Sequence, residues 1–387
     1  MAPDGPRNLG GDVLPGASAA DQHPATRLPL GTGRLESADL GDVTLEGGAA
    51  IPVTLAYRHD GPGADAPQVL VIHALTGSAD AAGDWWAPLI GPGRALDTER
   101  VGVLCANLLG GRYGSTGPTS ASPQTGEPYG AAFPQPSARD EARVTWALAA
   151  RLGIERFALV AGGSLGGMVT LEVALERPDR VDHVMPIAAP AAIGALAVAW
   201  NHIQLEIIDR LGADGLAIAR QLAMTTYRSE TDFEGRFGRS VQADGRFAVS
   251  SYLDHQGEKL LERFDPDTYR VLVRIMDGHD VGRGRGGIVE AFRSLATNDV
   301  GLTGLGIEGD LLYGPTQVRT LVDEAAAAGV DARYRELASI KGHDAFLTEW
   351  DQLAVIVGAA LAAGLARDAG EARGSGRSAV GAGAARG

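Results

Sequence analysis

The sequence has one cysteine, no long apolar run and a deficit of positive charge. Cys105 is the only cysteine among 387 residues, which excludes an internal disulfide and a metal cluster built from cysteines, and we expect it to lie in the core. No apolar run approaches the ~20 residues that a membrane span requires. Residues 1 to 30 lack the basic start and apolar centre of a signal peptide. These absences predict a cytoplasmic protein with no membrane partner and no bound metal.

The net negative charge of the chain argues against further classes of binding partner. The formal net charge is -14 at pH 7, and this charge opposes binding to nucleic acid and to anionic membrane surfaces. Hydrophobic residues make up 45% of the chain, which is enough to bury a full α/β core and an inserted subdomain. We therefore expect a globular protein that has no nucleic-acid partner.

The most informative stretch runs from Phe157 to Met168 and reads FALVAGGSLGGM. An apolar strand leads into Gly-x-Ser-x-Gly, and a helix follows over Leu165 to Glu176. This pattern is typical of a nucleophile elbow, a tight strand-to-helix turn that lifts a serine hydroxyl above a sheet. The turn requires small residues two positions before and after the serine, and Gly162 and Gly166 occupy them. The pattern predicts Ser164 as the nucleophile.

An acid and then a histidine should follow the elbow, each on a loop after a later strand. Asp310 follows the apolar segment 301–309, and His343 lies on the loop after an alternating strand over Ala332 to Leu337. Asp323 and Asp331 compete with Asp310 for the acid role, but they fall within or just after a predicted helix. Six other histidines are predicted to lie on the surface, in the lid or in a tail: His23, His59, His183, His202, His255 and His279.

These residues define a mechanism. His343 takes the proton of Ser164 as the serine attacks a carbonyl, while Asp310 orients the imidazole and stabilises its charge. The oxyanion that forms needs backbone N–H donors. One is the N–H of Leu165, directly after the nucleophile, and the second is the N–H of Leu75, in the loop 74–77 that follows the strand 68–73.

Several blocks then point to one family. The chain contains HALTG (73–77), WW (85–86), LIGPG (89–93) with LDT (96–98), NLLGG (107–111), YGSTGP (113–118), GGSLGGM (162–168), SYL (251–253) with HQG (255–257), and GHDAF (342–346). Together these blocks, over residues 40 to 365, resemble the homoserine O-acetyltransferase family. The resemblance implies an α/β-hydrolase fold, acetyl-CoA as co-substrate rather than a resident cofactor, and L-homoserine as the acyl acceptor. Because the chain is acidic, local basic residues must guide the anionic CoA.

The resemblance also implies residues that bind the substrate. Arg220, ahead of Thr226-Tyr227, would bind the carboxylate of an amino-acid acceptor, and Asp344, directly after the histidine, would bind its ammonium group. Tyr227 and Thr76 lie in the same family blocks and are predicted substrate contacts. The family further implies a homodimer formed through the lid.

The chain departs from the family pattern at Leu165, at Arg112 and over 309–314, where GDLLYG replaces a Ser-Asp-x-x-Phe/Tyr-Pro stretch. Leu165 replaces a methionine, which matters little because the oxyanion donor is a backbone group. Arg112 stands where a cysteine is common, and it could alter which donor or acceptor fits. Leu312 occupies the position at which the succinyl-using branch has an arginine, and this difference favours acetyl.

The domain organisation follows from composition and periodicity. We predict disordered tails over 1–30 and 367–387, an α/β core over 31–190 and 300–366, and a helical lid over 191–299. The core should contain a mainly parallel sheet covered by helices. A last helix, 346–365, closes it.

Three function classes remain open. The leading one is acetyl transfer to L-homoserine by a ping-pong route through acetyl-Ser164. The second keeps the triad but uses L-serine, succinyl-CoA or, as in an esterase, water. The third is a catalytically silent binding module, which the intact serine, acid and histidine oppose.

Overall fold

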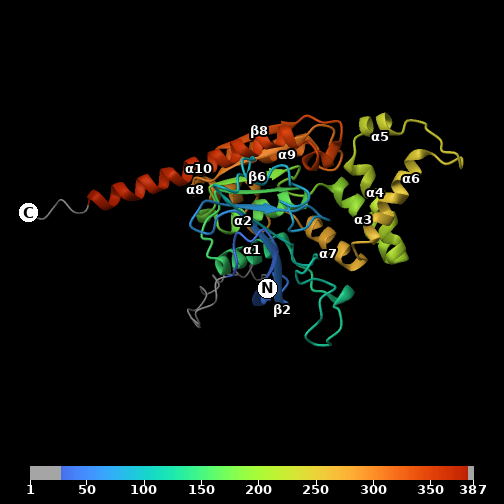
Figure 1. Ribbon diagram of the computed structural model, residues 1–387, viewed down its shortest axis with the longest axis horizontal. Helices are drawn as coiled ribbons and strands as arrows, with labels where there is room; N and C mark the ends of the chain where they lie inside the picture. Colours follow the sequence, from blue (N-terminus) through green and yellow to red (C-terminus); the bar gives the residue numbers. More distant parts are fainter. Residues whose placement is uncertain (1–27, 382–387) are drawn as a thin grey trace, which may run out of the picture.

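A computed structural model describes residues 28–381, and in it eight strands form one twisted sheet (Figure 1). The strand order is β1-β2-β4-β3-β5-β6-β7-β8. Strands β3 to β8 pair in parallel, whereas β1 and β2 pair antiparallel with each other and β2 pairs antiparallel with β4. The prediction of a mainly parallel sheet is confirmed. The strands are β1 (Leu35–Thr44), β2 (Ala50–Asp60), β3 (Gln68–Ile72), β4 (Gly102–Ala106), β5 (Leu159–Gly163), β6 (His183–Ile187), β7 (Gly301–Ile307) and β8 (Ala332–Leu337).

Helices cover both faces of the sheet, as predicted. On one face lie α1 (Ala138–Leu152), α2 (Leu165–Glu176), α8 (Ile288–Thr297) and α9 (Pro315–Ala327), whose apolar side chains share one core cluster. On the other face, α10 (Trp350–Gly381) contributes to a second cluster, which also contains Cys105. Three short 3₁₀ turns complete the core: η1 (Gly130–Ala132), η2 (Pro178–Arg180) and η3 (Gly342–Leu347).

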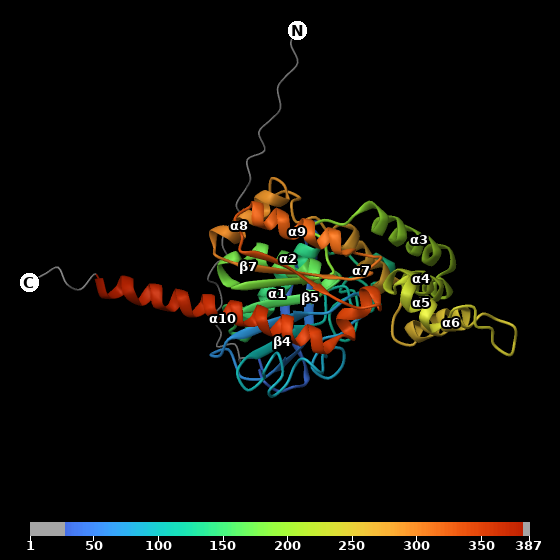
Figure 2. The ribbon, with the colours of Figure 1, turned by 90° about the horizontal axis from the view of Figure 1, so that it is seen from above.

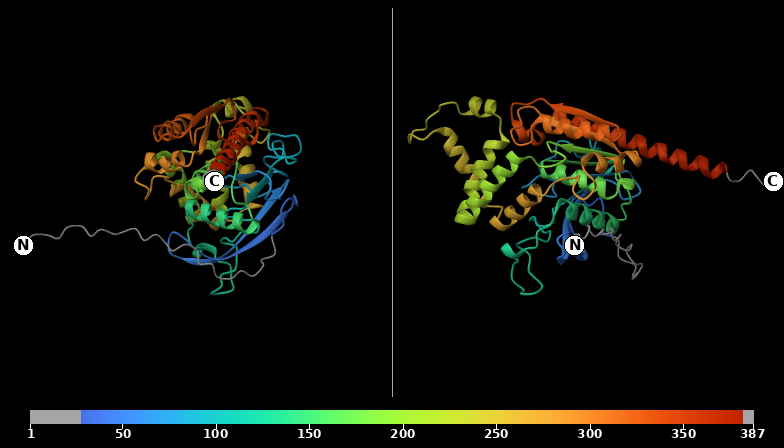
Figure 3. Two further views of the ribbon diagram at one scale, coloured as in Figure 1. Left: turned by 90° about the vertical axis from the view of Figure 1, so that its left-hand side faces the viewer. Right: turned by 180° about the vertical axis from the view of Figure 1, so that it is seen from behind.

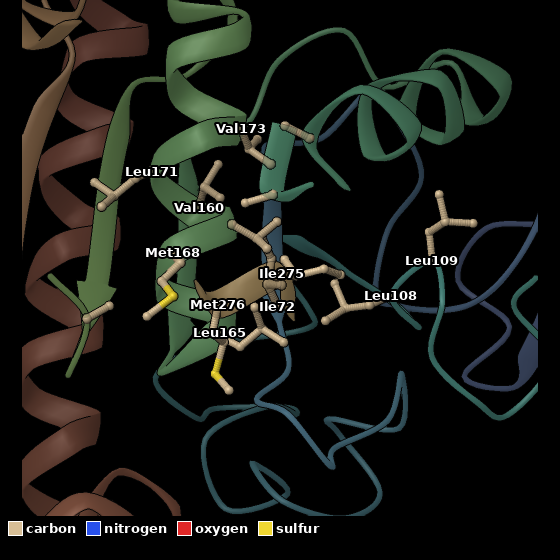
Figure 4. Close-up of a cluster of buried hydrophobic side chains, with 14 of the residues drawn as sticks. Ile72, Leu108, Leu109, Val160, Leu165, Met168, Leu171, Val173, Ile275 and Met276 are labelled. Atoms are coloured by element: carbon tan, nitrogen blue, oxygen red, sulfur yellow. The ribbon is translucent and has the colours of Figure 1, made fainter. Parts of the chain in front are cut away.

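The first cluster holds the helix that follows the elbow. Figure 4 shows Leu165 and Met168 of α2 beside Ile72 of β3 and Met276 of α7 (Pro266–Asp277), and all four side chains are buried. Burial of a large aliphatic side chain contributes roughly 1.5 to 3 kcal/mol. The packing therefore holds the start of α2, and with it the turn before it, in a fixed place on the sheet.

The lid projects from one end of the sheet (Figures 1 and 2). It consists of α3 (Ala195–Leu211), α4 (Ala213–Tyr227), α5 (Glu230–Arg236) and α6 (Ala248–Leu261), and α7 forms its base. The predicted lid, 191–299, also included α8. In the structure α8 instead packs on α2 and α9, because its apolar residues Ala291, Phe292 and Leu295 join the core cluster.

Helix α10 leaves the core at the end opposite to the lid (Figures 1 and 3). The predicted tail over 367–387 differs from the structure, where this helix continues to Gly381. The segment contains no proline that would end it. Residues 1–27 and 382–387, which include most of the predicted N-terminal tail, lie outside the described residues.

One part of α10 is apolar enough for a membrane span by length and composition alone, namely Trp350–Arg367 with a mean hydropathy of 1.2. Its residues Leu353, Val357, Ala360 and Leu361 are buried against the sheet. A helix that covers a sheet needs such an apolar face. The absence of a membrane partner stays a prediction.

Candidate active site

Ser164 lies in the sharp turn between β5 and α2. Its φ of 58° and ψ of -125° are rare for a residue with a side chain. A Cβ atom at Gly162 would come within 2.5 Å of the Gly166 carbonyl oxygen, and one at Gly166 would collide with the Ile72 backbone. Only glycine fits at both positions. The N–H of Ser164 donates to the Ile187 carbonyl at 2.9 Å, which ties the turn to β6.

The side chains of His343 and Asp310 are hydrogen-bonded to each other. The Nδ1 atom of His343 lies 2.7 Å from Oδ2 of Asp310, and both side chains are buried. The other carboxylate oxygen of Asp310 accepts hydrogen bonds from the N–H groups of Leu312 (2.8 Å) and Tyr313 (3.0 Å). Asp310 is therefore fixed as an acceptor, so the imidazole carries its proton on Nδ1 and presents Nε2 as a base.

The environment also sets the protonation of His343. Burial lowers its pKa, but the charge and hydrogen bond of Asp310 outweigh that effect, and the result is a pKa above 6.5. Its Nε2 atom has no hydrogen-bond partner within residues 28–381. The two competing acids lie elsewhere: Asp323 belongs to α9, and Asp331 pairs with Arg367 at 2.6 Å.

A cavity of about 200 Å³ brings the predicted site residues together. Ser164 and His343 line it on the core side, and the loop 74–77, which contains Leu75 and Thr76, forms another wall. The lining also includes Arg220, Tyr227 and Asp344. The cavity therefore combines a nucleophile, a base, a carboxylate and a cation that has no carboxylate partner within residues 28–381.

The two backbone N–H groups that are predicted to bind the oxyanion make no hydrogen bond within residues 28–381. Within the described residues, neither the N–H of Leu75 nor that of Leu165 donates to a protein acceptor. The loop that carries Leu75 is a tight turn, in which the N–H of Gly77 donates to the Ala74 carbonyl at 2.9 Å. Unpaired N–H groups beside a nucleophile are the arrangement that stabilises a tetrahedral oxyanion.

His73 braces this turn, a role that the sequence reading did not assign. Its Nδ1–H donates to the Ala74 carbonyl at 2.8 Å, and its Nε2 accepts from the N–H of Leu108 at 3.2 Å. Burial lowers the pKa of His73 to about 4, so the ring is neutral at physiological pH. The side chain thus connects the oxyanion turn to the loop after β4.

The two charged residues assigned to the acceptor differ in their surroundings. Arg220 has no carboxylate partner within the described residues, and its guanidinium lies 5.2 Å from the centre of the Tyr227 ring. Asp344 is already paired, because the Nε atom of Arg228 lies 3.2 Å from its Oδ2 atom. Arg228 was missed in the sequence, although it follows Thr226-Tyr227 directly.

Two further arginines, Arg112 and Arg263, lie where the sequence did not predict them. Arg112 does not line the cavity; it forms an ion pair with Asp265 at 3.2 Å, at the N-terminus of α7, and so connects the loop after β4 to the base of the lid. Arg263, which no sequence pattern indicated, does line the cavity and donates from Nη1 to the Thr76 carbonyl at 2.8 Å.

Other predicted placements also change. His59 and His183, which were predicted to lie on the surface or in the lid, are buried in the core, and His279, inside the predicted lid range, is buried as well. A ring nitrogen of each takes part in a hydrogen bond. Leu312 is buried in the core and does not line the cavity. Within residues 28–381 there is no group of three histidine, cysteine or carboxylate side chains arranged for a metal ion.

Comparison with known proteins places this chain in a family. A family model described as the alpha/beta hydrolase fold matches residues 67–259. The chain is 45% identical over 336 residues to a homoserine O-acetyltransferase of Thermus thermophilus, covering 80% of this chain and 83% of that one. It is 41% identical over 345 residues to a homoserine O-acetyltransferase of Moorella thermoacetica, covering 81% and 91%. The chain belongs to the homoserine O-acetyltransferase family. It is therefore an enzyme with the α/β-hydrolase fold, as the sequence predicted.

Solved structures support the fold but do not separate transferase from hydrolase. A homoserine O-acetyltransferase from Bacillus anthracis superposes with a TM-score of 0.79 at 23% identity, covering 85% of this chain and 97% of that one. The esterase E22 superposes almost equally well, with a TM-score of 0.78 at 23% identity over 85% and 99%. The homoserine O-acetyltransferase family thus shares its backbone with enzymes that pass an acyl group to water.

Proposed function

We propose that the chain transfers an acetyl group from acetyl-CoA to the hydroxyl of L-homoserine by a ping-pong mechanism through acetyl-Ser164. The observation that carries the proposal is the single cavity that Ser164, His343, Arg220 and Asp344 line together. A hydrolase needs the first two residues. An enzyme that selects an amino acid as acceptor needs all four.

In the first half-reaction, Ser164 Oγ attacks the thioester carbonyl while His343 Nε2 takes the hydroxyl proton. The N–H groups of Leu75 and Leu165 stabilise the oxyanion. As the carbon–sulfur bond breaks, the protonated His343 gives its proton to the leaving CoA sulfur, and acetyl-Ser164 remains. No resident cofactor takes part, because the acyl group arrives already activated as a thioester.

In the second half-reaction, the acceptor hydroxyl takes the place of the thiol. Arg220 binds the α-carboxylate and Asp344 the α-ammonium, so the hydroxyl at the other end of the molecule faces the acyl-serine. His343 removes the hydroxyl proton, the new ester forms, and Ser164 recovers its proton. Arg228 holds Asp344 from the lid, which keeps the carboxylate in place before the acceptor arrives.

A product assay tests the proposal. The enzyme is given acetyl-CoA or succinyl-CoA, with L-homoserine, L-serine or no acceptor, and both the products and the mass of the protein are measured. We expect O-acetyl-L-homoserine and, without acceptor, one acetyl group on Ser164. Ser164→Ala should keep its fold and form neither. A dominant acetate product, or preference for serine or succinyl-CoA, would favour the second function class instead.

The lid surface supports an assembly as well. Most of the large hydrophobic side chains that are exposed among the described residues lie on the lid, namely Leu196, Val198, Ile203, Leu211, Ile218, Val241, Phe247 and Leu261. A gathering of exposed apolar side chains on one part of a molecule is typical of an interface. We propose that two copies associate through the lid, and that the enzyme works in the cytoplasm.

A further inference from the structure

A second cavity of about 600 Å³ lies beside the catalytic one. The two cavities share four lining residues, Thr76, Gly77, Asp84 and Arg263. Cavities that bind drug-sized ligands usually measure roughly 300 to 1,000 Å³. The catalytic cavity, at about 200 Å³, has room for an acyl group and a small acceptor, whereas the second has room for a much larger molecule.

Arg263 stands between the two spaces. It lies just after α6, and its Nη1 donates to the Thr76 carbonyl at 2.8 Å while its Nη2 lies 3.5 Å from the Thr76 hydroxyl. The side chain is exposed. A long flexible side chain therefore lies where the two cavities meet.

The wall of the second cavity carries more positive than negative side chains, although the protein as a whole is acidic. Three arginines line it, Arg34, Arg58 and Arg263, against two carboxylates, Asp80 and Asp84. Arg58 is already neutralised, because it pairs with Asp60 at 2.9 Å and contacts Asp80 directly. Arg34 and Arg263 have no carboxylate partner within residues 28–381, so both cations are free to bind an anion.

The rim adds an apolar surface to this charge. Leu35, next to Arg34 at the start of β1, has 55% of its surface exposed and lines the same cavity. Guanidinium groups bind phosphate oxygens through several hydrogen bonds. A rim with a free arginine and an exposed leucine suits a molecule that carries both phosphate groups and apolar atoms.

We propose that the second cavity binds the phosphate-bearing arm of the acyl thioester donor, with Arg34 and Arg263 as its phosphate contacts. The thioester end then passes Arg263 to reach Ser164. This inference rests on the proposed use of acetyl-CoA and adds where the nucleotide part of that donor is held. It also explains how an acidic enzyme attracts an anionic substrate, since the favourable charge is local.

The experiment compares two donors that share one thioester. Acetyl-CoA carries phosphates, whereas S-acetyl-N-acetylcysteamine carries none. We expect the ratio of kcat/KM for acetyl-CoA to kcat/KM for the phosphate-free donor to fall roughly ten-fold in Arg34→Gln, because a charged hydrogen bond is lost. The fall should be larger in Arg34→Glu. Arg151→Gln, which replaces an exposed arginine of α1 outside both cavities, should keep the wild-type ratio.

Salt provides an independent readout. Added NaCl should raise the KM for acetyl-CoA in the wild type, because it screens an exposed ion contact, and this dependence should weaken in Arg34→Gln. Equal ratios in the wild type, Arg34→Gln and Arg34→Glu would overturn the inference while leaving the acetyl-enzyme chemistry intact. A wild type that forms acetyl-Ser164 from neither donor would instead refute the proposed function itself.

Discussion

At the scale of single residues, Asp310 controls the chemistry that His343 can perform. Both carboxylate oxygens are occupied, one by two backbone N–H groups and one by the imidazole. Such a carboxylate cannot turn away from the ring. It therefore fixes the tautomer of His343 and raises the pKa of the imidazole above 6.5, in spite of burial.

This arrangement predicts a pH profile. His343 must be unprotonated to act as a base, so kcat/KM should fall as the pH drops through its raised pKa. In Asp310→Asn the stabilising charge is lost, so the acid limb should move to lower pH and turnover should fall by about 10⁴-fold, as in a serine protease triad. The pH dependence of both proteins is measured with acetyl-CoA and homoserine. A near-normal rate for Asp310→Asn would assign the acid role to another carboxylate.

Arg220 separates transfer from hydrolysis. Arg220→Gln removes a charged hydrogen bond worth ~1.5 to 3 kcal/mol, so kcat/KM for homoserine should fall roughly ten-fold to a hundred-fold. Acetylation of Ser164 by acetyl-CoA should continue. Rapid-quench mass spectrometry of the protein measures this half-reaction separately. Arg210→Gln on α3, where the arginine is exposed and pairs with Glu206, serves as the matched control. Unchanged use of homoserine by Arg220→Gln would exclude Arg220 from the acceptor site.

At the scale of elements, the oxyanion turn is held by a side chain that does not line the catalytic cavity. His73 links the Ala74 carbonyl to the N–H of Leu108. In His73→Asn the turn loses this brace, and the N–H of Leu75 should lose its alignment. We expect kcat to fall ~10-fold to 100-fold, somewhat less than when an oxyanion donor is removed outright, with little change in the KM for homoserine.

A matched variant tests whether this effect is only structural. His183 is similarly buried, with a pKa lowered to about 4 and a hydrogen bond to Thr303 at 2.8 Å. It lies at the start of β6, however, whereas Ser164 follows the end of the parallel neighbour β5. His183→Asn should lower the melting temperature without lowering kcat. If the two variants lose kcat equally, the positioning role of His73 is refuted.

The junction between α4 and α5 clamps the loop that carries His343. Ser229 contacts the Ile340 carbonyl through its hydroxyl, and a Cβ atom at Gly342 would come within 2.7 Å of the Ser229 backbone nitrogen. Gly342 also has a φ of +67°. The lid and the catalytic base therefore share one tightly packed contact, which leaves no room for a side chain.

This contact predicts an effect on both stability and rate. Gly342→Ala should destabilise the fold by at least ~1 kcal/mol, because alanine is strained at positive φ, and it should also lower kcat by displacing His343. In Gly358→Ala, where nothing lies within 4 Å of the added Cβ, α10 should become slightly more stable instead. Thermal unfolding and kcat are measured for both. A fully active, stable Gly342→Ala would refute the clamp.

At the scale of the whole molecule, the exposed apolar side chains of the lid predict association. Leu211 and Ile218 are 53% and 42% exposed. The substitutions Leu211→Asp and Ile218→Asp should convert a dimer into monomers, because burying a charge at an interface is costly. Light scattering after gel filtration measures the mass. Val355→Asp on α10, where the valine is 73% exposed, should leave the mass unchanged. A wild type that is monomeric at all concentrations tested would refute the interface.

Much of the core could be predicted because its rules are local. Helix α2 and strand β8 have the predicted bounds, since apolar periodicity and nearby glycine or proline mark their ends. The β1–β2 hairpin was not predicted, because its burial pattern depends on a neighbour, β4, that comes much later in the chain. Likewise, the sequence assigned α8 to the lid, because its packing against α2 and α9 depends on residues far away in the chain.

The sequence by itself determined the nucleophile, the order of acid and base, and the loops that hold them, because the elbow and the strand ends impose these residues locally. The sequence favoured Asp310 over Asp323 and Asp331 as the acid, and the tertiary structure shows that Asp310 is the one that contacts His343. The tertiary structure alone decided that Arg228 holds Asp344, and that Arg263 divides two cavities. These contacts join residues up to 187 positions apart, and no local sequence pattern records which distant side chains will meet in the folded chain.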